Sequence, residues 1–242
     1  MADRLGDTIR FYELLDRLED RLGGPRLLRD SRGDMGWPQR GVYFFYENGE
    51  SRSVSGAGPR VVRIGTHGLT RGSKSTLWGR LSQHRGPSKS GLGNHRGSIF
   101  RLLVGVALAN RSNIPLPESW GIAGSTGEAA LKLNVGRDAV KEAEAEIEGL
   151  VSKYIGQMPF LWLNVNDAPG PNSRRGFIER NAIALLSSYI TPAADRLSSE
   201  WLGRHSNRER VRLSGLWNNN HVDESYDRSF LDEMESWIDA AT

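Results

Sequence analysis

Two short apolar runs place the strongest constraint on the fold of this 242-residue chain. Gly41–Tyr46 (GVYFFY) and Val61–Ile64 (VVRI) are rich in aromatic and β-branched residues, which is typical of buried strands. The segment between them is rich in Gly and Ser and contains Asn48-Gly49. Because such a segment favours a turn between antiparallel strands, the sequence predicts a β-hairpin with a long, mobile tip.

The rest of the chain adds one strand and several helices. A third strand is predicted over Pro159–Val165, and the apolar Ser98–Ala109 segment favours a buried helix, although a strand fits the same pattern. Residues Arg111–Gly136 are expected to be irregular. Apolar spacing predicts helices over Thr8–Leu22, around Arg80, and over Asp138–Tyr154, Arg174–Ile190 and Phe230–Ile238.

These elements predict an α/β fold of the α+β type, in which a small three-stranded antiparallel sheet is flanked by helices. Residues 1–40 are expected to form an N-terminal helix and linker. Residues 41–190 would form the core, with basic and helical insertions. Residues 191–242 would form a C-terminal extension packed on that core.

Composition excludes several classes of protein. The chain has no Cys, which excludes disulfides, thiolate zinc sites and a Cys nucleophile. No apolar run approaches about 18 residues, so no membrane span is expected. The first residues are charged and lack the apolar segment of a signal peptide, so we expect a cytoplasmic location. The five His residues show no paired metal-ligand spacing, and no nucleophile-elbow, Walker or dinucleotide motif is present.

Charge is segregated along the chain. Between Ser51 and Pro117 there are eleven basic residues and no acidic one, whereas the remainder carries 21 basic against 29 acidic residues (32 − 11 = 21). This pattern indicates a polyanion-binding face on an otherwise acidic protein, and a solvated basic surface without a partner is the alternative. The acidic run Glu142–Glu148 is interpreted as the solvated face of its helix.

The stretch Val61–Arg85 carries a strand, a polar basic loop and a short helix. Arg80 and His84 lie four residues apart on that helix, so both side chains can address one small target. The stretch contains cations and no carboxylate, so it predicts an anion-binding pocket, with phosphate as the expected anion.

Four motifs in a fixed order carry a family resemblance. Gly41-Val42-Tyr43, Arg63-Ile64-Gly65, Arg80-x-x-x-His84 and Glu179 on a helix after the third strand resemble the GIY-YIG nuclease family. The connecting pattern agrees as well, at Gly65, Thr66, Leu69, Leu77, Arg80, Leu81 and His84. The resemblance covers Gly41 to Ile190. A basic insertion, Thr70–Thr76, is similar to those of the family's restriction endonucleases. Arg63 departs from the pattern, because the family usually has Tyr there.

The resemblance implies a catalytic set of Tyr43, Arg63, Arg80, His84 and Glu179. Arg80 would donate a forked pair of hydrogen bonds to the scissile phosphate. Tyr43 would activate or position the attacking water in the field of the two arginines, and His84 would bind phosphate or assist proton transfer. Glu179 would hold Mg²⁺ or Mn²⁺. The family's downstream Asn would be one of Asn218–Asn220.

The expected partner is double-stranded DNA, and a homodimer is expected if both strands are cut symmetrically. Basic loops would grip backbone phosphates through Arg71, Lys74, Arg85, Lys89 and Arg96. A non-catalytic nucleic-acid-binding module on a degenerate nuclease fold is the alternative, with Arg63 as the first sign of lost chemistry. A third possibility is a nuclease that acts on RNA. In purely structural readings Tyr43 is a core aromatic residue, Glu179 is a buried salt-bridge partner of Arg174, Arg175 or Arg180, and Arg80 and His84 form an exposed helix face.

Overall fold

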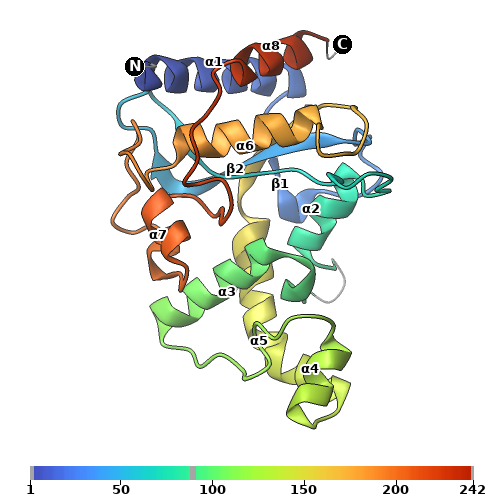
Figure 1. Cartoon of the computed structure of the whole chain (residues 1–242). Coiled ribbons are helices and arrows are strands. Elements are labelled where there is room, and N and C mark those ends of the chain that lie inside the picture. Colours follow the sequence, from blue (N-terminus) through green and yellow to red (C-terminus); the bar gives the residue numbers. More distant parts are fainter. Residues whose placement is uncertain (1–2, 88–90, 241–242) are drawn as a thin grey trace.

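The computed structural model describes residues 3–87 and 91–240. Its centre is an antiparallel sheet of four strands in the order β1-β4-β2-β3 (Figure 1). The strands are β1 (Arg26–Leu27), β2 (Gly41–Ser51), β3 (Pro59–Gly65) and β4 (Pro159–Asn164). The predicted hairpin is confirmed as β2 and β3. The prediction of three strands was wrong, because the two-residue β1 is too short to show any periodic pattern.

Helices cover both faces of the sheet. One face carries α1 (Arg4–Leu22), α6 (Arg174–Leu186) and α8 (Phe230–Ala240), as Figure 1 shows. The other carries α2 (Leu77–Arg85), α3 (Ile99–Ser112) and α5 (Arg137–Gly156). Because side chains alternate along a strand, Val42 and Phe44 enter the first core, whereas Tyr43 and Phe45 enter the second. The aromatic run on β2 is therefore buried on both sides.

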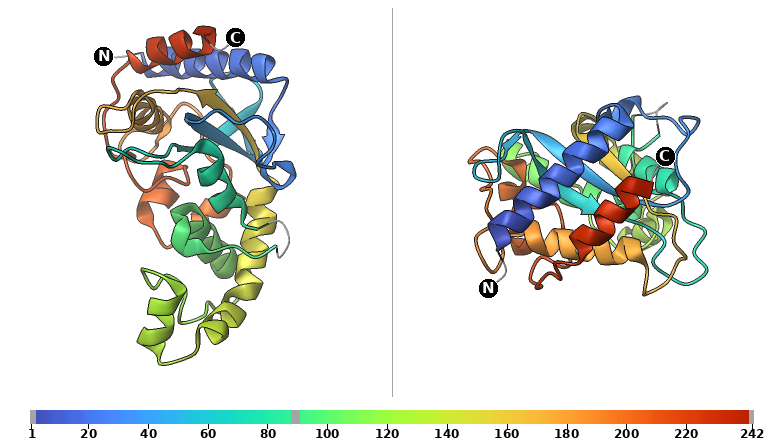
Figure 2. Two further views of the ribbon diagram at one scale, coloured as in Figure 1. Left: turned by 90° about the vertical axis from the view of Figure 1, so that its right-hand side faces the viewer. Right: turned by 90° about the horizontal axis from the view of Figure 1, so that it is seen from above.

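The predicted helices are confirmed with small shifts at their ends, and Ser98–Ala109 lies almost wholly within the helix α3. The segment expected to be irregular contains α4 (Thr126–Leu133), which begins with a Ser125–Glu128 capping box. That start signal is visible in the sequence. The α4 helix and the adjoining part of α5 project away from the sheet as an arm (Figure 2). No helix of residues 3–87 or 91–240 is long and apolar enough to cross a membrane.

Shorter elements complete the part of the chain that the structure describes. Three are 3₁₀ helices, η1 (Leu28–Asp30), η2 (His95–Gly97) and η3 (Leu202–His205), and α7 (Glu209–Ser214) is a short α-helix. The segments before residue 41 and after residue 190 both pack on the sheet through α1, β1 and α8. The division into a core and two extensions stays a prediction.

The tip of the β2–β3 hairpin is clamped, contrary to the expectation that it is mobile. One oxygen of Asp195 accepts hydrogen bonds from the backbone N–H groups of Ser53, Val54 and Ser55, at 2.8, 2.9 and 3.0 Å. The Ser55 hydroxyl donates to the other oxygen of the same carboxylate. A residue far along the chain therefore fixes the loop, and no local sequence signal predicts this.

Two carboxylates of the acidic run on α5 are buried. The side chains of Glu144 and Glu148 are 7% and 3% exposed. Glu144 accepts two hydrogen bonds from Arg96, at 2.7 and 2.8 Å, and Glu148 pairs with Arg101. For these two residues the interpretation as a solvated face was wrong. Cations that are segregated in sequence are thus neutralised in space, which reduces the basic surface.

A buried carboxylate on β2 holds the C-terminal segment to the sheet. Glu47 accepts hydrogen bonds from the indole N–H groups of Trp201 (3.2 Å) and Trp217 (2.8 Å) and from the Tyr154 hydroxyl. Burial raises the pKa of Glu47. The backbone N–H of Trp217 also donates to the Val62 carbonyl at 2.7 Å, so this segment runs along β3.

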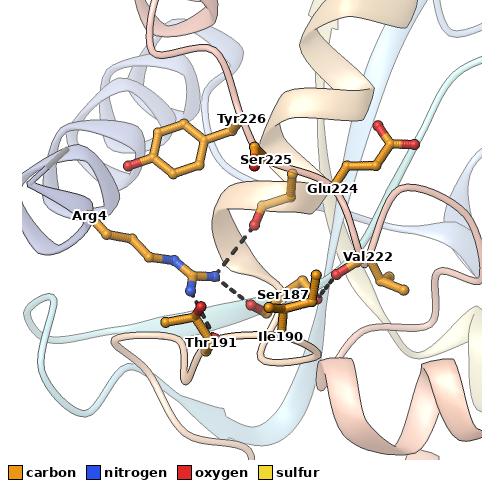
Figure 3. A pocket seen from close by; sticks show the side chains of 9 residues that line it. Arg4, Ser187, Ile190, Thr191, Val222, Glu224, Ser225 and Tyr226 are labelled. Atoms are coloured by element: carbon orange, nitrogen blue, oxygen red, sulfur yellow. Dashed lines mark hydrogen bonds between the residues drawn. The ribbon is translucent and has the colours of Figure 1, made fainter. Parts of the chain in front are cut away.

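An open pocket of about 360 Å³ lies between α1 and the end of α6, and it belongs to this scaffold (Figure 3). The Arg4 guanidinium projects into it and donates to the carbonyls of Leu185 (2.8 and 3.0 Å), Thr191 (2.8 Å) and Ser187. These carbonyls include ones that the end of a helix leaves unpaired. Arg4 therefore ties α1 to α6, and its donors are occupied by backbone.

Glu47→Ala should lower the free energy of unfolding by about 3 kcal/mol, because it leaves two buried indole N–H groups and one half-buried phenol without an acceptor. Urea denaturation followed by tryptophan fluorescence measures the loss. Glu142→Ala is the matched control, since Glu142 is an exposed carboxylate on α5 and should change stability little. Equal stability of the two variants would contradict the structural role of Glu47.

Candidate active site

The Tyr43 ring lies across Gly65, its register partner on β3. A Cβ atom at Gly65 would sit 2.3 Å from the Tyr43 hydroxyl oxygen, a distance that no side chain can occupy. The glycine of the second motif is therefore required by the tyrosine of the first. Tyr43 is fully buried, and its hydroxyl points toward the end of the hairpin where the chain leaves β3.

A buried hydrogen-bonded chain starts at the Tyr43 hydroxyl. It bonds to His84 Nε2 at 2.8 Å, and His84 Nδ1 bonds to the Ser98 hydroxyl at 2.7 Å. Burial lowers the pKa of His84 far below its ordinary value, and the Arg80, Arg63 and Arg101 cations lower it further. The imidazole is therefore neutral. Ser98 was missed by the sequence analysis, although Ser before the apolar run of α3 is a recognisable N-cap.

Glu179 approaches the same end of β3 from the opposite face of the sheet. It is half-buried on α6, and its Oε1 accepts a hydrogen bond from the Thr66 backbone N–H at 3.1 Å. Thr66 follows Gly65 directly, and its hydroxyl donates to the Gly41 carbonyl at 2.8 Å. Burial raises the pKa of Glu179, while Arg63, His221 and Arg80 act in the opposite direction.

The two predicted arginines differ in accessibility. Arg80 is half-buried and donates to the Gly97 carbonyl and to Gln83 Oε1, each at 3.0 Å. Arg63 is 6% exposed, donates to the Trp217 carbonyl and lies 5.2 Å from the centre of the Phe100 ring. Both cations lower the pKa of Glu179 and the pKa of His84. The structure thus brings the five predicted catalytic residues into one electrostatic neighbourhood.

Asn218 is the member of the Asn218–Asn220 cluster that reaches β3. Its Oδ1 accepts from the Ile64 N–H at 3.2 Å, and its Nδ2 donates to the Ile64 carbonyl at 2.8 Å. The amide therefore pairs with both polar groups of one strand residue, next to Arg63. Its contact is with the backbone of β3, so Asn218 positions the strand.

The structure describes four of the five predicted DNA-contacting residues, and these four fall into three groups. Arg71 and Lys74 are exposed on the loop before α2. Arg85 is half-buried, with its guanidinium 5.1 Å from the Trp78 ring centre and a hydrogen bond to the Ser31 carbonyl. The Arg96 side chain is 4% exposed and bonds to Glu144, so in this conformation it serves the fold. Lys89 lies outside the described residues.

A divalent cation would depend on few protein ligands here. Within residues 3–87 and 91–240, no group of three or more His, Asp or Glu side chains could hold a metal ion. Glu179 offers one half-buried carboxylate, of which one oxygen is held by Thr66 N–H. This donor set fits Mg²⁺, which commonly takes one or two carboxylates and completes its shell with water and substrate phosphate.

Comparison with known proteins identifies the family of this chain. A family model described as a GIY-YIG domain matches residues 2–242, and the chain therefore belongs to the GIY-YIG family. Membership implies endonuclease activity on DNA, and nucleases of this family generally depend on a divalent metal. Neither a search of curated proteins nor one of solved structures finds a match to the chain.

Gly65→Ala should lower the free energy of unfolding by about 1–3 kcal/mol, because the new methyl group collides with the Tyr43 phenol. Thermal and urea denaturation measure this loss. Gly170→Ala is the matched control, since this glycine lies in a loop, a Cβ there meets nothing within 4 Å, and its φ is not in the left-handed region. If both variants keep the stability of the wild type, the close approach of Tyr43 to Gly65 is not what the fold requires.

Proposed function

We propose that this protein is a metal-dependent DNA endonuclease of the restriction type, which cleaves at a specific sequence. The observation that carries the proposal is the bond between Tyr43 and the neutral His84, beside a carboxylate anchored to Thr66 N–H. A phenol, a base that can accept its proton, and a carboxylate for the cation thus meet at one end of β3. Arg80 adds a half-buried cation at the same place.

In the proposed reaction, the Nδ1–H of His84 stays hydrogen-bonded to Ser98, and phosphate binding exposes the site to water and offsets the Arg80 charge, so that the pKa of His84 is no longer held down and Nε2 can take the Tyr43 proton. The Tyr43 phenolate then takes a proton from water as that water attacks phosphorus. Arg80 donates to the non-bridging oxygens, on which negative charge develops. Glu179 would hold Mg²⁺ or Mn²⁺, which supplies positive charge at the leaving oxygen.

Substrate binding must open this site, because Tyr43 and His84 are both fully buried. The bond from Arg80 to the Gly97 carbonyl joins α2 to η2 beside the buried pair. A DNA phosphate that binds the Arg80 guanidinium would compete with the Gly97 carbonyl and break this bond. We therefore propose that phosphate binding at Arg80 releases η2 and gives water access to Tyr43.

The burial that requires this opening also supports a second candidate, a DNA-binding module without catalysis. Arg63 stands where the family usually has Tyr, and its guanidinium is committed to the Trp217 carbonyl and the Phe100 ring. A closed site and a structurally engaged Arg63 are compatible with binding alone. Cleavage assays separate the two candidates directly.

Incubation with supercoiled plasmid and Mg²⁺ should give nicked or linear product, and EDTA should prevent it. Arg80→Ala and Glu179→Ala should each lower the cleavage rate by about 100-fold or more, because each removes charge that the transition state needs. Arg196→Ala is the control, since this exposed cation follows Asp195, which binds the opposite end of the hairpin. DNA binding without cutting in any divalent metal would favour the non-catalytic candidate.

Two exposed cations on the loop between β3 and α2 are proposed to contact DNA. Arg71 and Lys74 lie on this loop, whose base is closed by a 3.1 Å hydrogen bond between His67 Nδ1 and the Ser75 carbonyl. Burial, with nearby Arg175, lowers the pKa of His67 to about 4, so the ring is neutral and Nδ1 donates. The loop is thereby held beside Thr66 and the proposed site.

Arg71→Ala and Lys74→Ala should each reduce the slope of log Kobs against log salt concentration by about 1, since each would release one counterion fewer. Binding of the wild type and variants to a labelled duplex, across a salt series with Ca²⁺ in place of Mg²⁺, measures the slope. Arg196→Ala should leave the slope unchanged. Unaltered slopes for both loop variants would mean that DNA lies elsewhere.

Restriction-type specificity rests on the segments beyond the core, above all the arm formed by α4 and part of α5. Sequencing the ends of cleaved plasmid tests it. One recurrent sequence at the ends is expected, and random ends would contradict sequence recognition. Symmetric double-strand cuts would further support a homodimer.

A further inference from the structure

The His221 side chain lines the same pocket as Glu179. An open pocket of about 370 Å³ lies beside the first turns of α6, and its lining includes Glu179, Ser173, Phe177 and His221. His221 comes from the segment that follows Asn218, and it is among the groups that act electrostatically on the Glu179 carboxylate. No metal-ligand spacing in the sequence includes His221, so the sequence alone does not single this residue out.

The orientation of the His221 ring is set by Glu224. His221 Nδ1 lies 2.8 Å from Glu224 Oε1, and a carboxylate can only accept, so Nδ1 carries the hydrogen. The other carboxylate oxygen pairs with Arg180 Nε, which holds Glu224 in place. In the neutral ring Nε2 therefore keeps its lone pair. The two side chains are 32% and 28% exposed, so this nitrogen belongs to an accessible part of the protein.

The backbone at His221 is unusual. Its φ is +64°, and the only other non-glycine residues with positive φ among the described residues are Asn113 and Asn134, which end α3 and α4. Asn and His adopt this conformation more often than other non-glycine residues, but it remains unfavourable for any residue with a Cβ atom. Strained backbone of this kind clusters at functional sites, which is consistent with a role for the ring beyond packing.

We propose that His221 is a second protein ligand, through Nε2, for the divalent cation at Glu179, and that Glu224 is its positioning residue. The inference rests on the proposed function, because it takes Glu179 as the first ligand. A His that binds metal generally donates its other N–H to a carboxylate or carbonyl, which is the arrangement seen here. Imidazole adds affinity for transition metals, whereas Mg²⁺ prefers oxygen ligands. The site should therefore favour Mn²⁺ over Mg²⁺.

The test is Mn²⁺ binding to the full chain without DNA, followed by electron paramagnetic resonance and isothermal titration. Wild type should show modulation of the Mn²⁺ spin echo by a directly bound ¹⁴N nucleus. His221→Asn should abolish this signal and weaken Mn²⁺ binding by about 10- to 100-fold, with a smaller effect on Mg²⁺. Asn is chosen because it tolerates the positive φ, so an altered backbone does not confound the result.

Further variants separate the inference from the proposed function. Glu224→Gln should weaken Mn²⁺ binding less than His221→Asn, and His205→Asn, at an exposed His on η3, should have no effect. If the wild type binds no Mn²⁺ or shows no ¹⁴N modulation, or if His221→Asn binds Mn²⁺ like the wild type, the inference is overturned. Plasmid cleavage that still depends on Glu179 would then leave the proposed function intact. If Glu179→Ala leaves both plasmid cleavage and Mn²⁺ binding unchanged, the inference and the proposed function are both overturned.

Discussion

The close approach of the Tyr43 phenol to Gly65 is the contact on which the site depends. It brings the hydroxyl to the end of β3, where the hydroxyl hydrogen-bonds to His84 on one face of the sheet. On the other face, the Thr66 N–H donates a hydrogen bond to Glu179. A methyl group at Gly65 would fill this space, so two motifs that are separate in sequence form one steric unit. The antiparallel register of β2 and β3 sets Tyr43 directly opposite Gly65.

Buried polar contacts between distant segments build the frame around this unit. Glu47 accepts hydrogen bonds from Tyr154, Trp201 and Trp217, and so holds the C-terminal segment beside β3. Glu148 and Arg101 join α5 to α3, whose first turn carries Ser98. Such ion pairs are costly to leave half-formed, because removal of one partner strands a buried charge. The positions of Asn218 and Ser98 at the site therefore follow from charges that have no part in the chemistry.

The sequence predicted the hairpin and the long helices, because strand composition and apolar spacing are local signals. The catalytic roles assigned from motif order stay a prediction. It could not predict that Asp195 clamps the hairpin tip or that Glu144 neutralises Arg96, since these pairs lie 140 and 48 residues apart in sequence. The 3₁₀ turn that contacts Arg80 and the two-residue strand β1 are too short for periodicity to show. The extent of free basic surface is likewise a property of the fold, because it depends on which carboxylates reach which cations.

The segment at Trp217 and Asn218 covers the polar edge of β3. It occupies the Val62 carbonyl and both backbone groups of Ile64, which an edge strand would otherwise offer to another chain. At the opposite edge, β1 has only two residues. It pairs with Pro159 and Phe160, and among the described residues the rest of β4 has no neighbouring strand on that side. The contacts of Trp217 and Asn218 therefore occupy the edge at β3 alone, and a homodimer formed at any other surface would leave the strand that bears Arg63 and Gly65 unchanged.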